Sequence, residues 1–286
     1  MRKIKVHEII LTLFVLLAIA VWVGYFQYRD DKLKVYFFNV GQGDSSMLVL
    51  PGAQEVLIDG GPDSNVMSEI GKAMPFFDRE IELVILTHPH ADHVVGLIDV
   101  LEHYKVDEVW LTNVDYESEP YSKFKRLVAD KNIKTYSPQV GDIQRIGELK
   151  IQTLAPTEDY SGKKVENINN TSIVSKISYK DISFLMTGDA ELDEQTEVLK
   201  NGFDLSSQVL KEPHHGSEKV SEDFINKVNA KVTIISCGKN NQYGFPNGQT
   251  LDKLKKISSE IFRTDEKGTI FFKTNGNLPL SAPSFL

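Results

Sequence analysis

The sequence predicts a layered α/β domain that follows one apolar N-terminal helix. From residue 33 onward, short runs of apolar and β-branched residues alternate with segments of helical periodicity. The first thirty residues instead contain an uncharged apolar run, Ile9 to Phe26. With 286 residues, 41% hydrophobic and 25% charged, the chain is long and apolar enough to bury a large core. This combination excludes a disordered chain, a collagen-like repeat and a transporter with many membrane spans.

The apolar run is predicted to be a membrane anchor over residues 9–28, preceded by a short segment of residues 1–8. Its 18 uncharged residues would span about 27 Å as a helix, close to the roughly 30 Å of a bilayer core. Basic residues precede the run and aromatic residues end it, as they flank membrane spans: Arg2, Lys3, Lys5, Trp22, Tyr25 and Tyr28. We expect a single-pass protein of the cell membrane whose large domain is extracytoplasmic.

The sequence leaves two alternatives to an anchor. One is a buried core helix, although such helices seldom lack every charge over this length. The other is a cleaved signal peptide, because Ala18 and Ala20 have the small-residue spacing that a signal peptidase requires. The apolar run continues beyond them through Val21, Trp22 and Val23, which favours a retained anchor.

The rest of the chain contains no linker rich in proline, glycine or serine, so we predict one domain over residues 33–277. The predicted strands are 34–40, 47–50, 55–58, 82–87, 108–111, 149–154, 173–178, 183–186, 208–210, 231–236 and 269–273. The predicted helices are 66–74, 93–104, 120–130, 192–201, 221–228 and 250–257. The tail 278–286 contains two prolines and is expected to be frayed.

Charge and cysteine content narrow the function classes. A net charge of −8 argues against a protein that coats nucleic acid through overall basicity. A local basic groove remains compatible with it, and its candidate residues are Lys211, Lys239, Arg263 and Lys267. The single cysteine, Cys237, excludes a disulfide framework and an all-cysteine metal site.

Five of the seven histidines fall into two clusters, each placed directly after an apolar strand. The carboxyl ends of strands are where α/β proteins build binding sites. His88 and His90, two residues apart in extended chain, can point the same way toward one metal ion. Asp92 and His93 begin a helix and can face a second ion. A lone histidine is more often a surface or core residue, as we interpret His103.

Two neighbouring ions need a bridging carboxylate and ligands from elsewhere in the chain. Asp189 follows an apolar strand and is the candidate bridge, although it could instead cap the next helix. His214 and His215 follow another apolar strand. Because adjacent side chains diverge, we expect only one of them to bind metal, with His214 favoured. His215 is then expected to line the site and to act with Asp92 in catalysis.

The stretch Thr87-His88-Pro89-His90-Ala91-Asp92-His93 resembles the metal-binding signature of the metallo-β-lactamase superfamily. More narrowly, the chain resembles the extracytoplasmic hydrolase domain of ComEC-type DNA-uptake proteins. The matching stretches occur in the expected order over nearly everything after the anchor: 38–44, 57–61, 169–172, 185–189, 214–217 and 263–265. The resemblance implies an αβ/βα four-layer sandwich with a dinuclear metal site at one edge.

The resemblance also implies that Asp44 and Asp59 support the metal-binding loops, with turn formation as their alternative role. Two positions depart from the family pattern. No histidine lies between His103 and His214, so the additional histidine that many members supply to the first metal is missing. Asn170 or water would then complete that shell. Phe245 replaces the usual histidine of a Tyr-Gly-His-Pro stretch and can neither bind metal nor donate a proton.

The predicted function is a membrane-anchored, metal-dependent phosphodiesterase, for which the resemblance suggests single-stranded DNA as substrate. Two divalent ions, zinc or alternatively manganese, would activate a bridging hydroxide for attack on phosphorus. Ser217, Asn241 and Tyr243 are candidates for orienting the substrate or protonating the leaving group. The alternatives are an envelope esterase similar to phosphorylcholine esterases and a non-catalytic, metal-bound binding or sensing module.

Overall fold

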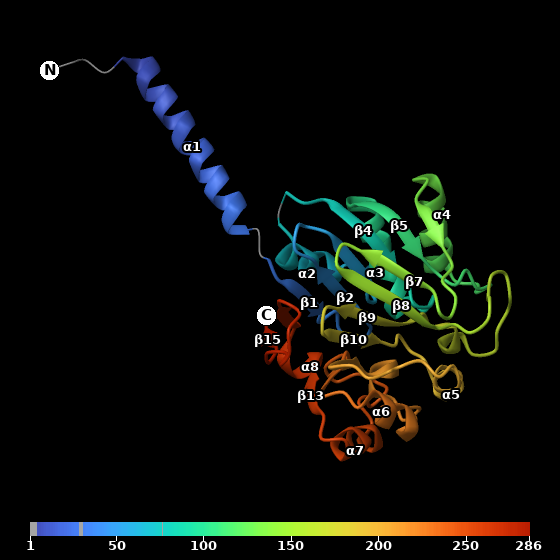
Figure 1. Cartoon of the computed structure of the whole chain (residues 1–286). Helices are drawn as coiled ribbons and strands as arrows, with labels where there is room; N and C mark the ends of the chain where they lie inside the picture. The colour runs from blue at the N-terminus through green and yellow to red at the C-terminus, as the bar shows by residue number, and fades with distance from the viewer. Residues whose placement is uncertain (1–4, 29–30, 76) are drawn as a thin grey trace.

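A computed structural model describes residues 5–28, 31–75 and 77–286 of the chain. Its strands form two sheets that pack face to face, and helices cover both outer faces (Figure 1). The expected αβ/βα four-layer sandwich is therefore confirmed. Arg2 and Lys3, on which the expected anchor partly rests, lie outside the described residues, as do the side chains of Tyr25 and Tyr28.

The first sheet has eight strands in the order β15-β14-β1-β2-β3-β4-β5-β6. The strands β3 to β6 are parallel, and the other neighbours are antiparallel. Their bounds are β1 Leu33–Phe37, β2 Ser46–Val49, β3 Glu55–Ile58, β4 Glu80–Ile85, β5 Lys105–Trp110, β6 Lys134–Tyr136, β14 Ile270–Thr274 and β15 Ser284–Phe285.

The second sheet has seven strands in the order β13-β12-β11-β10-β9-β8-β7. Here β10 to β13 are parallel, so their carboxyl ends meet at one edge of the sheet. The bounds are β7 Ile143–Ile146, β8 Leu149–Ala155, β9 Val174–Tyr179, β10 Ile182–Met186, β11 Val209–Lys211, β12 Val232–Ile235 and β13 Glu260–Arg263.

Alternation along the strands explains why helices cover both faces. In β1, Val35 and Phe37 enter the core between the two sheets, whereas Tyr36 enters the core beneath the helices. A sheet with two apolar faces must be covered on both. The helices α2 Asn65–Ala73, α3 Ala91–His103 and α4 Glu119–Asp130 cover the first sheet. The helices α5 Leu192–Lys200, α6 Glu222–Val228 and α7 Gly248–Lys256 cover the second.

The predicted helices and most predicted strands are found within a few residues of their expected bounds, and four strands were missed. None of the residues of β6, β7 and β13 is fully buried, so the sequences of these strands lack a strong apolar pattern. The expectation of a frayed tail is wrong for its end, because β15 pairs antiparallel with β14 and Leu286 N donates to Thr269 O at 2.9 Å.

The N-terminal helix α1 (Val6–Tyr28) extends away from the two sheets (Figure 1). Its segment Val6–Val23 has a mean hydropathy of 2.4, and none of it is buried. The alternative of a buried core helix is therefore wrong. By length and composition the helix can cross a membrane, and a signal sequence has the same properties.

Candidate metal centre

The two histidine clusters and Asp189 meet in one pocket of about 660 Å³ at the edge of the sandwich. The first cluster lies on the loop from β4 into α3, Asp189 follows β10, and His214 and His215 lie on the 3-10 helix η2 (Pro213–Gly216) after β11. Each contributing strand ends at this edge. The pocket therefore joins segments from both sheets, as expected for carboxyl ends of parallel strands.

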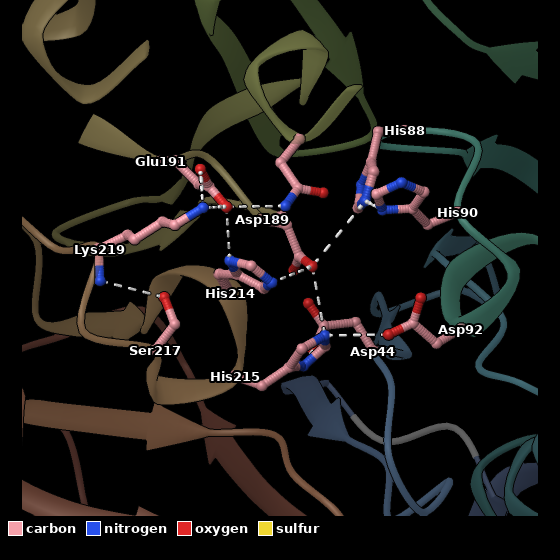
Figure 2. Close-up of polar contacts among 12 residues, drawn as sticks. Asp44, His88, His90, Asp92, Asp189, Glu191, His214, His215, Ser217 and Lys219 are labelled. Atoms are coloured by element: carbon pink, nitrogen blue, oxygen red, sulfur yellow. Dashed lines mark hydrogen bonds and ion pairs between the residues drawn. The ribbon is translucent and has the colours of Figure 1, made fainter. Parts of the chain in front are cut away.

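The carboxylate of Asp189 lies at the centre of these groups (Figure 2). Its Oδ2 atom is 3.3 Å from His215 Nε2 and 3.4 Å from His93 Nε2. The same oxygen is 3.9 Å from His88 Nε2 and 3.8 Å from His214 Nε2. One carboxylate thus faces donors from both clusters, which is the geometry a bridging ligand requires.

Three of the histidines near Asp189 are His88 and His90, which lie side by side, and His214, which lies across Asp189 from them (Figure 2). His88 Nε2 is 3.1 Å from His90 Nδ1. Glu191 Oε1 lies 3.1 Å from His214 Nδ1, which leaves His214 Nε2 directed toward Asp189. Burial, reinforced by the neighbouring His93, lowers the pKa of His88 well below its ordinary value, so its imidazole is neutral and offers a lone pair.

Asp92, His93 and His215 form a second group near Asp189. Together with Asp189 they place one donor atom each within 4.8 Å of one another. His215 Nε2 is 3.2 Å from Asp92 Oδ2. Donors bound about 2.1 Å from one tetrahedral ion lie about 3.4 Å apart, so these distances suit a single divalent cation.

The expectation that His214 and His215 diverge is not met. Both have left-handed backbone conformations, with φ of 49° and 56°, and both rings reach Asp189. Asn170 does not line the pocket: its amide oxygen accepts from Glu191 N at 3.0 Å.

Asp59 supports His93 on the side of the ring that faces away from Asp189. Its carboxylate accepts from Thr87 N and Thr87 Oγ1, each at 2.8 Å, and lies 2.8 Å from His93 Nδ1. This contact directs His93 Nε2 toward Asp189. The contact between Asp59 and His93 requires the helix α3 to pack very closely on the loop after β3. A Cβ atom added to Gly96 would lie only 1.9 Å from Gly60 O. Glycine is the residue that permits this approach.

Asp44 and Lys211 form a fully buried ion pair beneath the pocket. Lys211 Nζ also donates to Gly188 O at 3.0 Å and lies 3.9 Å from Asp189 Oδ1. Burial would raise the pKa of Asp44, but Lys211 and His215 outweigh it and lower that pKa. Lys211 is therefore not part of a basic groove on the surface, as the sequence had suggested. Arg263, another candidate for that groove, pairs with Asp265 and Glu266.

Buried polar atoms that lack a hydrogen-bond partner indicate whether this pocket suits metal ions. Among the described residues, Asp189 Oδ1, His93 Nε2 and His215 Nε2 are buried without a hydrogen-bond partner. Buried polar groups normally have such partners, because their desolvation is costly. Imidazole and carboxylate groups are ligands of zinc and related divalent ions. The donor set therefore fits divalent ions, and the donor atoms of Asp92, His93, Asp189 and His215 are close enough together to bind one.

The remaining candidate residues have different surroundings. Ser217 and Tyr243 line the pocket, and Ser217 Oγ accepts from Lys219 N at 3.3 Å. Asn241 does not line it, because its amide bonds to the backbone of its own loop at Gly238 and Phe245.

Sequence reasoning missed Asn169, Glu191 and Lys219. Asn169 Nδ2 donates to Glu191 Oε1 at 2.9 Å, and Lys219 Nζ contacts both Glu191 oxygens, at 2.9 and 2.8 Å. Burial would raise the pKa of Glu191, but Lys219 and the asparagines outweigh it and lower that pKa. Their positions in the sequence could have identified two of these residues, because Glu191 lies two residues after Asp189 and Lys219 closely follows His215.

The comparisons with known proteins agree on one family. The model of the metallo-beta-lactamase superfamily matches residues 39–239. Among curated proteins, ComE operon protein 3 of Bacillus subtilis (strain 168) is 30% identical over 259 residues, which cover 84% of this chain and 33% of that protein. Recombination protein 2 of Haemophilus influenzae is 28% identical over 251 residues, 85% of this chain and 29% of that protein. The chain thus spans about a third of the length of these curated relatives.

A solved structure supports the same fold. The metallo-beta-lactamase fold protein YhfI from Bacillus subtilis superposes with a TM-score of 0.59 and 14% identity, over 86% of this chain and all of that one. At this identity the likeness concerns the fold.

Proposed function

The chain belongs to the metallo-beta-lactamase superfamily and is a metal-dependent hydrolase of that family, and on this premise we propose that it is a phosphodiesterase acting on DNA. The observation that carries the proposal is the position of Asp189, whose Oδ2 lies 3.3 to 3.9 Å from the Nε2 atoms of four histidines, His88, His93, His214 and His215. This arrangement supports a dinuclear centre at the floor of an open pocket.

The proposed ligands form two groups around the shared Asp189: His88, His90 and His214 for one ion, and Asp92, His93 and His215 for the other. A pair of divalent ions lowers the pKa of a water molecule and polarises phosphoryl oxygens, which is the chemistry that hydrolysis of a phosphodiester requires. Zinc suits the imidazole-rich group, and manganese suits a mixed set of nitrogen and oxygen donors.

The charge of the pocket supports an anionic substrate only when cations are bound. Asp92, Asp189 and Glu218 line it, whereas Lys219 is paired with Glu191. These carboxylates alone would repel a phosphodiester, and two divalent ions would reverse the sign. The Ser217 hydroxyl also lines the pocket and can donate to a phosphoryl oxygen.

DNA is favoured by two observations. The chain resembles the hydrolase domain of DNA-uptake proteins over nearly its whole length after α1, and one of its relatives carries the name recombination protein. In this proposal His214 is the third imidazole of the group with His88 and His90, which weakens the case for a non-catalytic binding module, since the missing histidine was one of two features favouring that alternative. Phe245, the other feature, contacts His214 with ring centroids 5.6 Å apart.

We further propose that α1 anchors the chain in the cell membrane with the hydrolase domain outside. The support is a span of 18 residues of high hydropathy, none of it buried against the domain. The outward orientation rests on the resemblance to an extracytoplasmic domain, because the three basic residues before the run are matched by Arg29, Lys32 and Lys34 after it.

The decisive experiment measures hydrolysis by the full chain in detergent, loaded separately with zinc and with manganese. The substrates are bis(p-nitrophenyl) phosphate, a single-stranded oligodeoxynucleotide and p-nitrophenyl phosphorylcholine. We expect metal-dependent cleavage of the first two, abolished in Asp92→Ala and retained in Asp99→Ala, a carboxylate on the same helix away from the pocket. Cleavage of the choline ester alone would support the esterase, and absence of cleavage by folded, metal-loaded protein would support the binding module.

A further inference from the structure

Three rings form a row that leads from the metal centre to the surface. Phe245 packs edge-on against His214, with ring centroids 5.6 Å apart and an interplanar angle of 69°. Tyr243 stacks on Phe245, also at 5.6 Å but at an angle of 20°. Both aromatic residues line the pocket that contains Asp189. Tyr243 is 59% exposed, so its ring ends the row at the surface.

The loop that carries these rings is firmly held. Asn241 Oδ1 accepts from Tyr243 N at 3.2 Å and Phe245 N at 3.0 Å, and its Nδ2 donates to Phe245 O at 2.7 Å. Beyond the rings, Asn247 N donates to Gly216 O at 2.7 Å, which ties the loop to the turn of the two histidines. The rings are therefore positioned before any ligand arrives, which reduces the entropy lost on binding.

The Tyr243 ring has no evident role in stabilising the fold. It lies outside the three apolar cores, and its hydroxyl makes no hydrogen bond within the described part of the chain. A large exposed aromatic ring beside a polar pocket is typical of a recognition surface. The ligand that fits it is planar and lies close to a group bound at the metal centre.

We propose that Tyr243 and Phe245 form a stacking platform for an unpaired nucleobase next to the phosphodiester that is cleaved. This inference rests on the proposed function and adds to it a preference for single-stranded, base-bearing substrates. Stacking on aromatic side chains is the usual way in which proteins hold single-stranded nucleic acid without reading its sequence. In a duplex the bases are stacked on one another and paired, so they cannot occupy the platform.

The geometry favours a nucleobase over a quaternary ammonium group such as choline. A cage for such a cation needs rings that face it from several sides. Tyr243 and Phe245 instead lie nearly parallel and in contact, so they present one flat face. Tyr116, which also lines the pocket, has its ring against His90, with centroids 5.7 Å apart, rather than against these two.

The test compares a twelve-residue thymidine oligomer with an oligomer of equal length and charge whose residues are abasic. Metal-loaded full chain in detergent should cleave the base-bearing oligomer with about tenfold higher kcat/KM, mainly through a lower KM. Tyr243→Ala should reduce this ratio toward one, whereas Tyr243→Phe should keep it. Gln242→Ala, an exposed neighbour that does not line the pocket, is the matched control and should keep the ratio as well.

The failure of this inference can be told from the failure of the proposed function. Cleavage of both oligomers with a ratio that Tyr243→Ala leaves unchanged would overturn the platform alone, as would a Tyr243-dependent preference for p-nitrophenyl phosphorylcholine. If neither oligomer is cleaved, the proposed function is wrong, and fluorescence anisotropy with the same labelled oligomers then tests the platform directly. Equal affinity of wild type and Tyr243→Ala for the base-bearing oligomer would overturn it.

Discussion

His214 and His215 are adjacent in the chain, and both have left-handed backbone conformations that turn their rings toward the same Asp189 oxygen. In an extended strand these side chains would point to opposite faces. A left-handed conformation costs a residue other than glycine about 1–2 kcal/mol, so the surrounding contacts must hold the turn. One of them joins His215 Nδ1 and Ser236 O at 3.0 Å. Strain of this kind is frequent at functional sites.

Replacing either histidine should remove one metal ion. We expect His214→Ala and His215→Ala each to weaken one site by about 10- to 100-fold or more, so that each protein retains about one ion after dialysis. Metal content measured by mass spectrometry checks this, with the exposed His103→Ala as control. If one of the two variants keeps both ions, that histidine is not a ligand.

Asp189→Asn should affect both ions together. An amide cannot supply the charge that the shared carboxylate provides, so metal content should fall at both sites and hydrolysis should drop about 100-fold or more. Asp193→Asn, an exposed carboxylate on α5, is the matched control. Full activity in Asp189→Asn would remove this residue from the bridge.

Asp59→Asn should weaken metal binding although Asp59 is not a proposed ligand. Its carboxylate orients His93 through a contact of 2.8 Å, and loss of such a supporting partner typically costs 10- to 100-fold in metal affinity or activity. The prediction is checked by titration with a competing chelator. The exposed Asp63→Asn should behave like the wild type, and equal affinity of Asp59→Asn and wild type would mean that His93 is held by other contacts.

Glu55 should make stability fall as pH rises. Burial and the neighbouring Asp78 and Glu82 raise the pKa of Glu55 from 4.5 to about 8. Between these values the folded chain keeps a proton that the unfolded chain releases. The stabilisation is complete below about pH 4.5 and is lost as pH rises through about 8. Glu55→Gln should therefore raise the free energy of unfolding at pH 8 by about 4 kcal/mol and leave it nearly unchanged at pH 4.5.

The measurement for Glu55 is urea denaturation of wild type and Glu55→Gln across this pH range. Because metal binding also depends on pH, the difference between the two proteins is compared rather than either curve alone. Glu148→Gln, an exposed carboxylate, should show no such difference. A constant difference between Glu55→Gln and wild type at all pH values would mean that Glu55 is ionised throughout.

The full chain should remain in the membrane fraction after expression, whereas a fragment starting at Leu33 should be released and keep its hydrolytic activity. The reason is that no residue of Val6–Val23 is buried against the domain. Fractionation, followed by mass spectrometry of the mature N-terminus, checks this. A terminus directly after Ala20 would identify a cleaved signal peptide and contradict the anchor.

Local pattern was enough to predict most of the fold. Buried strands such as β4 and β10 appear as continuous apolar runs, and the helices appear as apolar residues at helical spacing. The strands β6, β7 and β13 were not predicted because none of their side chains is fully buried. The strand β15 was not predicted because two residues are too few to show a pattern. It is defined only by its pairing with β14.

The sequence by itself determined which residues approach the site, because His88, His90, Asp92, His93, Asp189 and the His214–His215 pair each follow an apolar strand. Only the tertiary structure decided how they divide around Asp189, since the direction of His214 and His215 depends on a backbone turn held by distant contacts. The tertiary structure also places Lys211 in a buried ion pair with Asp44, whereas the sequence suggested a surface groove. The physical reason is common to both cases: the chemical type of a side chain is local, whereas its direction and burial depend on segments far apart in the chain.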